Sequence, residues 1–151
     1  MEGYPTVNAT DRRETTPVAP RPRQTDSEKI TINLGPVDLG QVDLLVQEGF
    51  YANRTDFIRT AIRNHLQVHA EVLRQTVTRK TMVLGLRHYS RDDLEAVRAQ
   101  GEQLQIQVVG LASIAHDVSA ELARATIHTV EVLGVFQATS AVKSALADRI
   151  R

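Results

Sequence analysis

The chain has 151 residues, no cysteine and a formal net charge of zero, with 18 Lys and Arg residues against 18 Asp and Glu residues. The lack of cysteine excludes disulfides and thiolate metal sites, and no apolar run reaches the roughly 20 residues that a membrane span needs. Without an excess of positive charge, any attraction for an anionic partner must come from a local patch. We therefore expect a cytoplasmic protein with no membrane segment.

Residues 1–27 hold many Thr and Pro residues and almost no periodic apolar positions. Such a segment cannot bury enough apolar surface to offset the entropy lost on ordering. We expect residues 1–27 to form a disordered tail.

The next stretch, EKITINL at residues 28–34, alternates between apolar and polar side chains, which is typical of a half-buried strand. The apolar face consists of Ile30, Ile32 and Leu34. The polar face consists of Lys29, Thr31 and Asn33. Because a lone strand leaves a row of backbone groups unpaired, we expect this strand to pair with the same strand of a second chain.

A short helix is expected immediately after the strand. Gly35 and Pro36 end the strand, because proline cannot donate to a strand ladder. We predict a helix over residues 39–47, with Asp38 as its N-cap and Gly49 at its C-terminal end.

A second and longer helix follows the polar turn YANRT at residues 51–55, with Asn53 or Thr55 as its cap. Apolar residues then recur every three or four positions from Ile58 to Val77, which gives one apolar stripe. The pattern predicts a single continuous helix.

Residues 29–66, KITINLGPVDLGQVDLLVQEGFYANRTDFIRTAIRNHL, resemble the ribbon-helix-helix family of DNA-binding proteins, of the Arc, MetJ and CopG type. The shared features are one alternating strand, a short helix ended by Gly, a polar turn and a second helix. The resemblance implies an intertwined homodimer, in which two antiparallel strands form a ribbon that enters the DNA major groove.

The resemblance also assigns site residues. It implies that base edges are contacted by the polar face of the strand, namely Lys29, Thr31 and Asn33. It implies that a DNA phosphate is held at the start of the second helix, by Asn53, Arg54 and Thr55. These side chains also have an ordinary structural interpretation, as solvent-facing strand residues and as helix caps.

The remaining residues contain two similar segments, QIQVVGLASIAHDVSAELA at 105–123 and TVEVLGVFQATSAVKSALA at 129–147, offset by 24 residues. Gly110 matches Gly134, and a fainter third copy places Gly85 against Gly110 with a one-residue slip. Each unit predicts a strand through the glycine, where we expect a bulge or a close strand approach, then a polar turn and an amphipathic helix. The helices are expected to begin near Tyr89-Ser90, His116-Asp117 and Thr139-Ser140.

Together these elements predict an α+β protein with three parts: the tail at 1–27, a ribbon-helix-helix dimerisation domain at 28–76, and a small α/β domain of strand-helix repeats at 77–151. Such units must stack on one another, which favours parallel strands joined by helical crossovers. The edges of so small a sheet invite pairing between subunits, so we expect tetramers or larger assemblies through residues 77–151.

Metal and catalytic chemistry find little support in the sequence. His65 and His69 have a metal-binding spacing, but no third ligand stands nearby, and the second half lacks the His-rich pattern of the nickel-responsive regulators. No nucleophile or general-base arrangement can be argued from spacing, and no phosphate-binding loop follows the glycines. We expect no enzyme activity, no metal and no cofactor.

The leading hypothesis is a nucleoid-associated, sequence-specific transcriptional repressor that binds double-stranded DNA. The alternatives are a partition-type DNA-binding protein that polymerises through its C-terminal repeats, and an antitoxin whose C-terminal part binds a toxin. A small-ligand sensor built on the strand-helix units also stays open.

Overall fold

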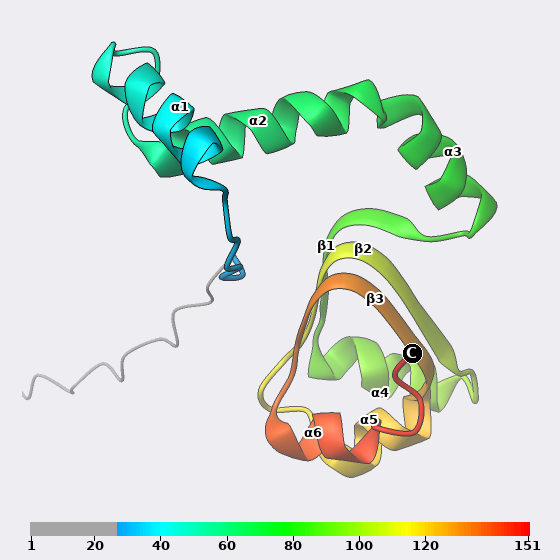
Figure 1. Cartoon of the computed structure of the whole chain (residues 1–151). Helices are drawn as coiled ribbons and strands as arrows, with labels where there is room; N and C mark the ends of the chain where they lie inside the picture. The colour runs from blue at the N-terminus through cyan, green and yellow to red at the C-terminus, as the bar shows by residue number, and fades with distance from the viewer. Residues whose placement is uncertain (1–26) are drawn as a thin grey trace, which may run out of the picture.

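The computed structural model describes residues 27–151, which form six helices and one three-stranded sheet (Figure 1). In chain order these are α1 (Pro36–Gln47), α2 (Arg54–Val68), α3 (Ala70–Arg79), β1 (Val83–Tyr89), α4 (Arg91–Ala99), β2 (Leu104–Ile114), α5 (Ala120–Thr126), β3 (Ile127–Gln137) and α6 (Ser140–Ala145). The mixture of helices and strands confirms the predicted α+β class. The predicted disordered tail lies outside the described residues, apart from Ser27.

Helix α1 begins earlier than the sequence analysis predicted. Gly35 is its N-cap and Pro36 its first residue, so the prediction of Asp38 as the cap was wrong. Proline fits the first helical position because its φ is already helical and its missing N–H would have no acceptor there. The predicted C-terminal end is confirmed, since Gly49 has a φ of +82° and the N–H of Phe50 donates to the carbonyl of Leu45 at 3.0 Å.

The prediction of one long second helix was wrong, because the helix is interrupted at His69. There φ is −99° and ψ is 8°, and the His69 N–H donates to the carbonyl of Leu66, three residues back, at 3.2 Å. Helix α3 then starts along a new direction (Figure 1). An apolar stripe identifies the buried face of a helix, but it carries no information on a change of axis along that stripe.

The three strands form one sheet in the order β1-β2-β3, and both neighbouring pairs are parallel. Each strand is connected to the next by a helix, which confirms the predicted parallel arrangement with helical crossovers. Gly85 pairs with Gly110, and Gly110 pairs with Gly134. The three glycines therefore lie in one row across the sheet.

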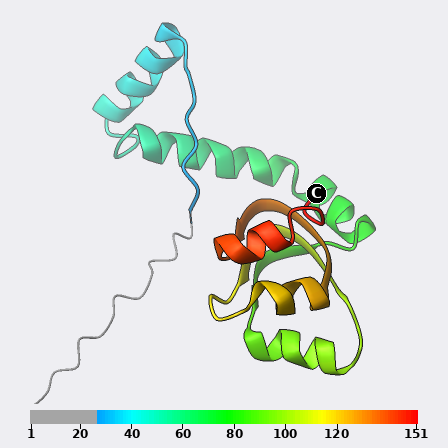
Figure 2. The same cartoon turned by 90° about the horizontal axis from the view of Figure 1, so that it is seen from below.

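The glycine row marks the place where the strands bend. Gly85, Gly110 and Gly134 have φ values of +133°, +138° and +126°, which L-residues rarely adopt. A Cβ atom at Gly110 would collide with the carbonyl oxygen of Gly85, and one at Gly134 would collide with that of Gly110. The predicted close strand approach is confirmed. As a result the sheet arches over α4, α5 and α6, which all lie on its concave side (Figures 1 and 2).

The core lies between the arched sheet and these three helices. It consists of Leu94, Ile106, Val108, Ala112, Ile114, Val118, Leu122, Ala123, Ile127, Val130, Val142 and Leu146. All of these side chains belong to residues 94–146, so the sheet region contains its own hydrophobic core. Every side chain in this core is aliphatic, in keeping with an aromatic content of only 4%.

Local caps fix where the three covering helices begin. Ser90 forms a capping box with Asp93 at the start of α4, and Thr139 accepts a hydrogen bond from the Val142 N–H at the start of α6. Helix α5 is capped by Ser119 rather than by His116 or Asp117, so that part of the prediction was wrong. Residues 115–118 form a turn before α5, because the Val118 N–H donates to the carbonyl of Ala115 and Val118 enters the core.

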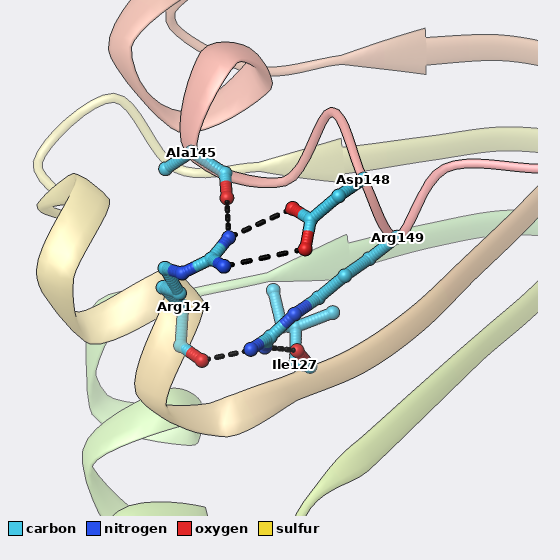
Figure 3. Close-up of polar contacts among 5 residues, drawn as sticks. All are labelled: Arg124, Ile127, Ala145, Asp148 and Arg149. Atoms are coloured by element: carbon cyan, nitrogen blue, oxygen red, sulfur yellow. Dashed lines mark hydrogen bonds and ion pairs between the residues drawn. The ribbon is translucent and has the colours of Figure 1, made fainter.

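Hydrogen bonds hold the C-terminal residues along the outer edge of β3 (Figure 3). The Val130 N–H donates to the carbonyl of Arg149, and the Arg151 N–H donates to the carbonyl of Val130, each at 2.9 Å. Arg124 donates to the Asp148 carboxylate at 2.8 and 3.2 Å, and Arg149 donates to the carbonyls of Arg124 and Ile127. The first half of the β3 edge is thus covered by the chain itself.

Candidate nucleic-acid interface

The segment at residues 28–34 precedes α1 in the chain and is exposed along its whole length. Among the described residues, none offers a backbone hydrogen-bond partner to residues 28–34. Its apolar side chains are also uncovered, with 70% of Ile30, 50% of Ile32 and 43% of Leu34 accessible. The segment has the side-chain alternation of a strand, but it forms no strand with any of the described residues, so the predicted pairing with a second chain stays a prediction.

The apolar face of this segment opens onto the two helices behind it. Ile32 and Leu34 line a hollow together with Leu39, Val42 and Ile58. A second hollow lies between α1 and α2 and includes Phe57 and Ile62. Between residues 27 and 81, only Val42 is a buried hydrophobic residue. The two helices therefore present an apolar groove rather than a closed core.

The polar face of the same segment carries Lys29, Thr31 and Asn33, all exposed. None of these three side chains has a hydrogen-bond or ion-pair partner among the described residues. Their donors and acceptors are consequently available to an incoming ligand. Lys can donate to guanine, Asn can pair with adenine through two hydrogen bonds, and Thr can contact either base or a thymine methyl group.

At the start of α2, the side chain of Asn53 is occupied by helix capping. Its Oδ1 accepts the Asp56 N–H at 2.9 Å, and the Asp56 carboxylate accepts the Ala52 N–H at 3.1 Å. The N–H groups of Arg54 and Thr55 belong to the first turn, where a helix offers no internal acceptor. Those two backbone groups, rather than the Asn53 side chain, are in position to hold an anion.

Arg54 forms an ion pair that the sequence analysis missed. Its guanidinium donates to both carboxylate oxygens of Asp43 on α1, at 2.5 and 2.6 Å. This hydrogen bond, with the charge of Arg54, holds the pKa of Asp43 below its usual value. The two residues are eleven positions apart on different helices, and no local sequence pattern links them. The pair fastens α1 to α2 beside the groove and partly neutralises a charge predicted to contact phosphate.

A family comparison now adds to this geometry. A model of the Ribbon-Helix-Helix transcriptional regulator family matches residues 25–143. The chain belongs to the ribbon-helix-helix transcriptional regulator family. The match covers the exposed segment, α1 and α2, and continues through the whole sheet into α6. Comparison with curated proteins and with solved structures gives no match.

As a ribbon-helix-helix regulator, the chain is placed among DNA-binding proteins that typically act as dimers. The resemblance recognised over residues 29–66 is confirmed, and the family extends well beyond it. The contacts predicted for individual residues on the strand and at the start of α2 stay predictions.

Other candidate chemistry in this ribbon-helix-helix chain is sparse. The rings of His65 and His69 contact each other edge to face, with centroids 5.0 Å apart. No group of three or more potential metal ligands occurs within residues 27–151. None of the described helices is long and apolar enough to cross a membrane.

Proposed function

We propose that this chain is a sequence-specific DNA-binding repressor that reads its operator with a two-stranded ribbon. Residues 28–34 of two copies pair as antiparallel strands, and the paired polar faces enter the major groove. In this arrangement Lys29, Thr31 and Asn33 contact base edges. The observation that carries the proposal is the exposed segment itself, which has polar side chains without partners on one face and uncovered apolar side chains on the other.

Burial of the apolar face supports the dimer. Pairing of two such segments places Ile30, Ile32 and Leu34 of both chains over the grooves between α1 and α2. Burial of apolar surface is worth about 25 cal/mol per Å², so covering six aliphatic side chains provides a substantial driving force for association. The same pairing would satisfy the backbone groups that have no partner among residues 27–151.

Contacts to DNA phosphate are proposed at the start of α2, through the backbone N–H groups of Arg54 and Thr55, next to the capping side chain of Asn53. The positive end of the helix dipole favours an anion there. Such contacts position the protein on DNA and do not select a sequence. The Asp43 carboxylate limits the contribution of the Arg54 side chain, because it already holds that guanidinium.

The C-terminal region, residues 77–151, is proposed to associate dimers into a tetramer, which raises the effective concentration at adjacent half-sites. Residues 77–151 contain a hydrophobic core of their own, which supports a folded association domain. The same core argues against an antitoxin segment, because such a segment would become ordered only when it binds its toxin. Polymerisation, as in a partition-type protein, is supported less well. The C-terminal residues already occupy the first half of the β3 edge, where a further subunit would add.

The experiment is selection of binding sites from random duplex DNA, followed by affinity measurements on the selected site and a scrambled site at two salt concentrations. Lys29→Ala and Asn33→Ala should each remove about 1–3 kcal/mol of discrimination between the two sites. Lys143→Ala removes the same charge from exposed α6 and serves as the matched control. Full discrimination in both ribbon variants would contradict the proposed readout.

A further inference from the structure

The proposed DNA contacts leave the convex face of the sheet unused. Helices α4, α5 and α6 cover only the concave face (Figures 1 and 2). Along β2, Val108 and Ala112 enter the core, whereas Val109 and Leu111 on either side of Gly110 do not. Since side chains alternate along a strand, Val109 and Leu111 point to the convex face.

Strand register extends this pattern across all three strands. Leu84, Val109 and Leu133 pair across the sheet on one side of the glycine row. Leu86, Leu111 and Val135 pair on the other side. These six residues form what we call the convex patch, and every one of them is aliphatic. Leu84, Leu86 and Leu133 are 67%, 73% and 55% exposed.

Polar rows border the convex patch at both ends. Gln107 pairs with Glu131 towards the start of the strands. His88, Ser113 and Gln137 are aligned towards the carboxyl ends, and His88 Nδ1 lies 2.8 Å from Ser113 Oγ. An apolar centre surrounded by a polar border is the usual composition of a protein–protein interface.

An uncovered face of this kind is unusual for a parallel sheet. Parallel sheets occur almost only where both faces are buried, because their crossover helices and partners cover them. Helix α3 precedes β1 in the chain but leaves the leucines of β1 exposed. Within residues 27–151, no element covers Leu84, Leu86 or Leu133.

We infer that the convex patch packs against the convex patch of a second copy of this chain. The inference rests on the proposed dimerising function and gives the C-terminal association a defined surface. Two observations select a second copy as the occupant. The patch contains no charged side chain, so two identical patches can meet without like-charge repulsion, as a two-fold interface requires. A dimer formed through residues 28–34 would also carry two such patches, so two dimers could be joined by two patch contacts at once.

The chain offers a direct test, because it has no cysteine. Leu111→Cys on the central strand places a single thiol in the convex patch of the full-length protein. Lys143→Cys places one on the exposed side of α6 and serves as the control with the same tether to the ribbon. Both variants are treated, without DNA, with a bismaleimide of short spacer, and covalent pairs are counted by mass.

We expect covalent pairs to form at least tenfold faster in Leu111→Cys than in Lys143→Cys. Adding Leu86→Glu to Leu111→Cys should reduce the rate to that of the control, because opposing carboxylates would be desolvated at the interface. Leu86 is 73% exposed, so this change should leave the far-UV circular dichroism of the chain unaltered.

Equal linking in the two single-cysteine variants, or a patch thiol that reacts with a monofunctional maleimide but does not link, would overturn the inference. The second result would mean that a different partner, or none, covers the face. Site discrimination on DNA is measured on the same Leu86→Glu sample. Intact discrimination with lost linking supports the inference, whereas lost discrimination in Lys143→Ala would count against the repressor proposal and not against the patch.

Discussion

The two halves of the described chain differ in how they bury their apolar side chains. Residues 27–81 form three helices and an extended segment, yet they bury a single hydrophobic side chain, that of Val42. Residues 83–151 form three strands and three helices around a closed aliphatic core. The first half has regular helices without a core, and the second half has both.

The difference shows that a region can have regular helices without burying their apolar side chains in a core of its own. Helix α2 has a side-chain cap at Asn53 and an ion pair joins it to α1, but among the described residues the two helices enclose no core. In the sheet region, each crossover helix returns the chain to a neighbouring strand, so apolar faces meet within one chain. The difference supports the proposal that a second copy completes the first half, whereas the second half has a core within one chain.

Ile32→Asp should produce the largest effect on dimer formation and DNA binding, and it should leave the fold of residues 83–151 intact. The carboxylate would enter the apolar groove between the paired segments, at a cost on the order of several kcal/mol per ion. We expect loss of the dimer formed by the ribbon and loss of DNA binding, measured by native mass spectrometry and by fluorescence anisotropy. Thr31→Asp places the same charge one residue away on the polar face and should keep the dimer while weakening DNA binding.

Leu94→Ala should destabilise the second half alone. Leu94 is fully buried in the core, and truncation of such a side chain costs about 2–5 kcal/mol. The urea concentration at the midpoint of unfolding, followed by the circular dichroism of the strands, should be lower in this variant. The size of this decrease should not depend on protein concentration. Arg98→Ala, at an exposed residue of the same helix, should change the stability by less than about 0.5 kcal/mol. Equal shifts for the two variants would mean that the core does not hold this half together.

Gly110→Ala and Gly85→Ala form a matched pair within the glycine row. Both place a side chain at a positive φ, which costs about 1–3 kcal/mol. At Gly110 the new Cβ also collides with the carbonyl of Gly85, whereas at Gly85 it meets open space. We expect Gly110→Ala to be the more destabilising by about 1–3 kcal/mol, the usual cost of overpacking, in thermal unfolding. The reverse order would show that the strands do not approach as closely as described.

The smallest effect on stability is expected from the Arg124–Asp148 ion pair, which holds the C-terminal residues against the sheet region. Arg124 lowers the pKa of Asp148, so ionised Asp148 stabilises the fold above the pKa that this group has in the unfolded chain. That contribution is lost as the pH falls through the lowered pKa of the folded state. Asp148→Asn should therefore lower the melting temperature slightly at neutral pH, and the difference should vanish in acid. A difference that is equally large in acid would contradict this role of the ion pair.

Much of this arrangement could be predicted from the sequence, where the determinant is local. The alternation at residues 28–34, the glycine after α1 and the cap at Asn53 are short-range signals, and they led to the family that the comparison supports. The glycine matches at 85, 110 and 134 also predicted the close approach of parallel strands.

Features that depend on tertiary placement could not be predicted in this way. The break at His69 lies inside an uninterrupted apolar stripe, and the Asp43–Arg54 pair joins residues with no shared local pattern. The start of α1 differs from the prediction because Asp38 and Gly35 are both acceptable caps, and the extended backbone of Gly35, with φ of −63° and ψ of 153°, identifies it as the cap. The convex patch likewise becomes visible only once the strand register is known.

Amide hydrogen exchange at a high and a low protein concentration tests the central difference between the two halves most directly. Dilution below the dissociation constant of the dimer should remove protection from peptides of α1 and α2, because in the proposed dimer a second copy covers their apolar groove. Peptides of β2 and α5 should keep their protection, since their core lies within one chain. Protection in α1 and α2 that persists in a sample shown by mass to be monomeric would contradict the account.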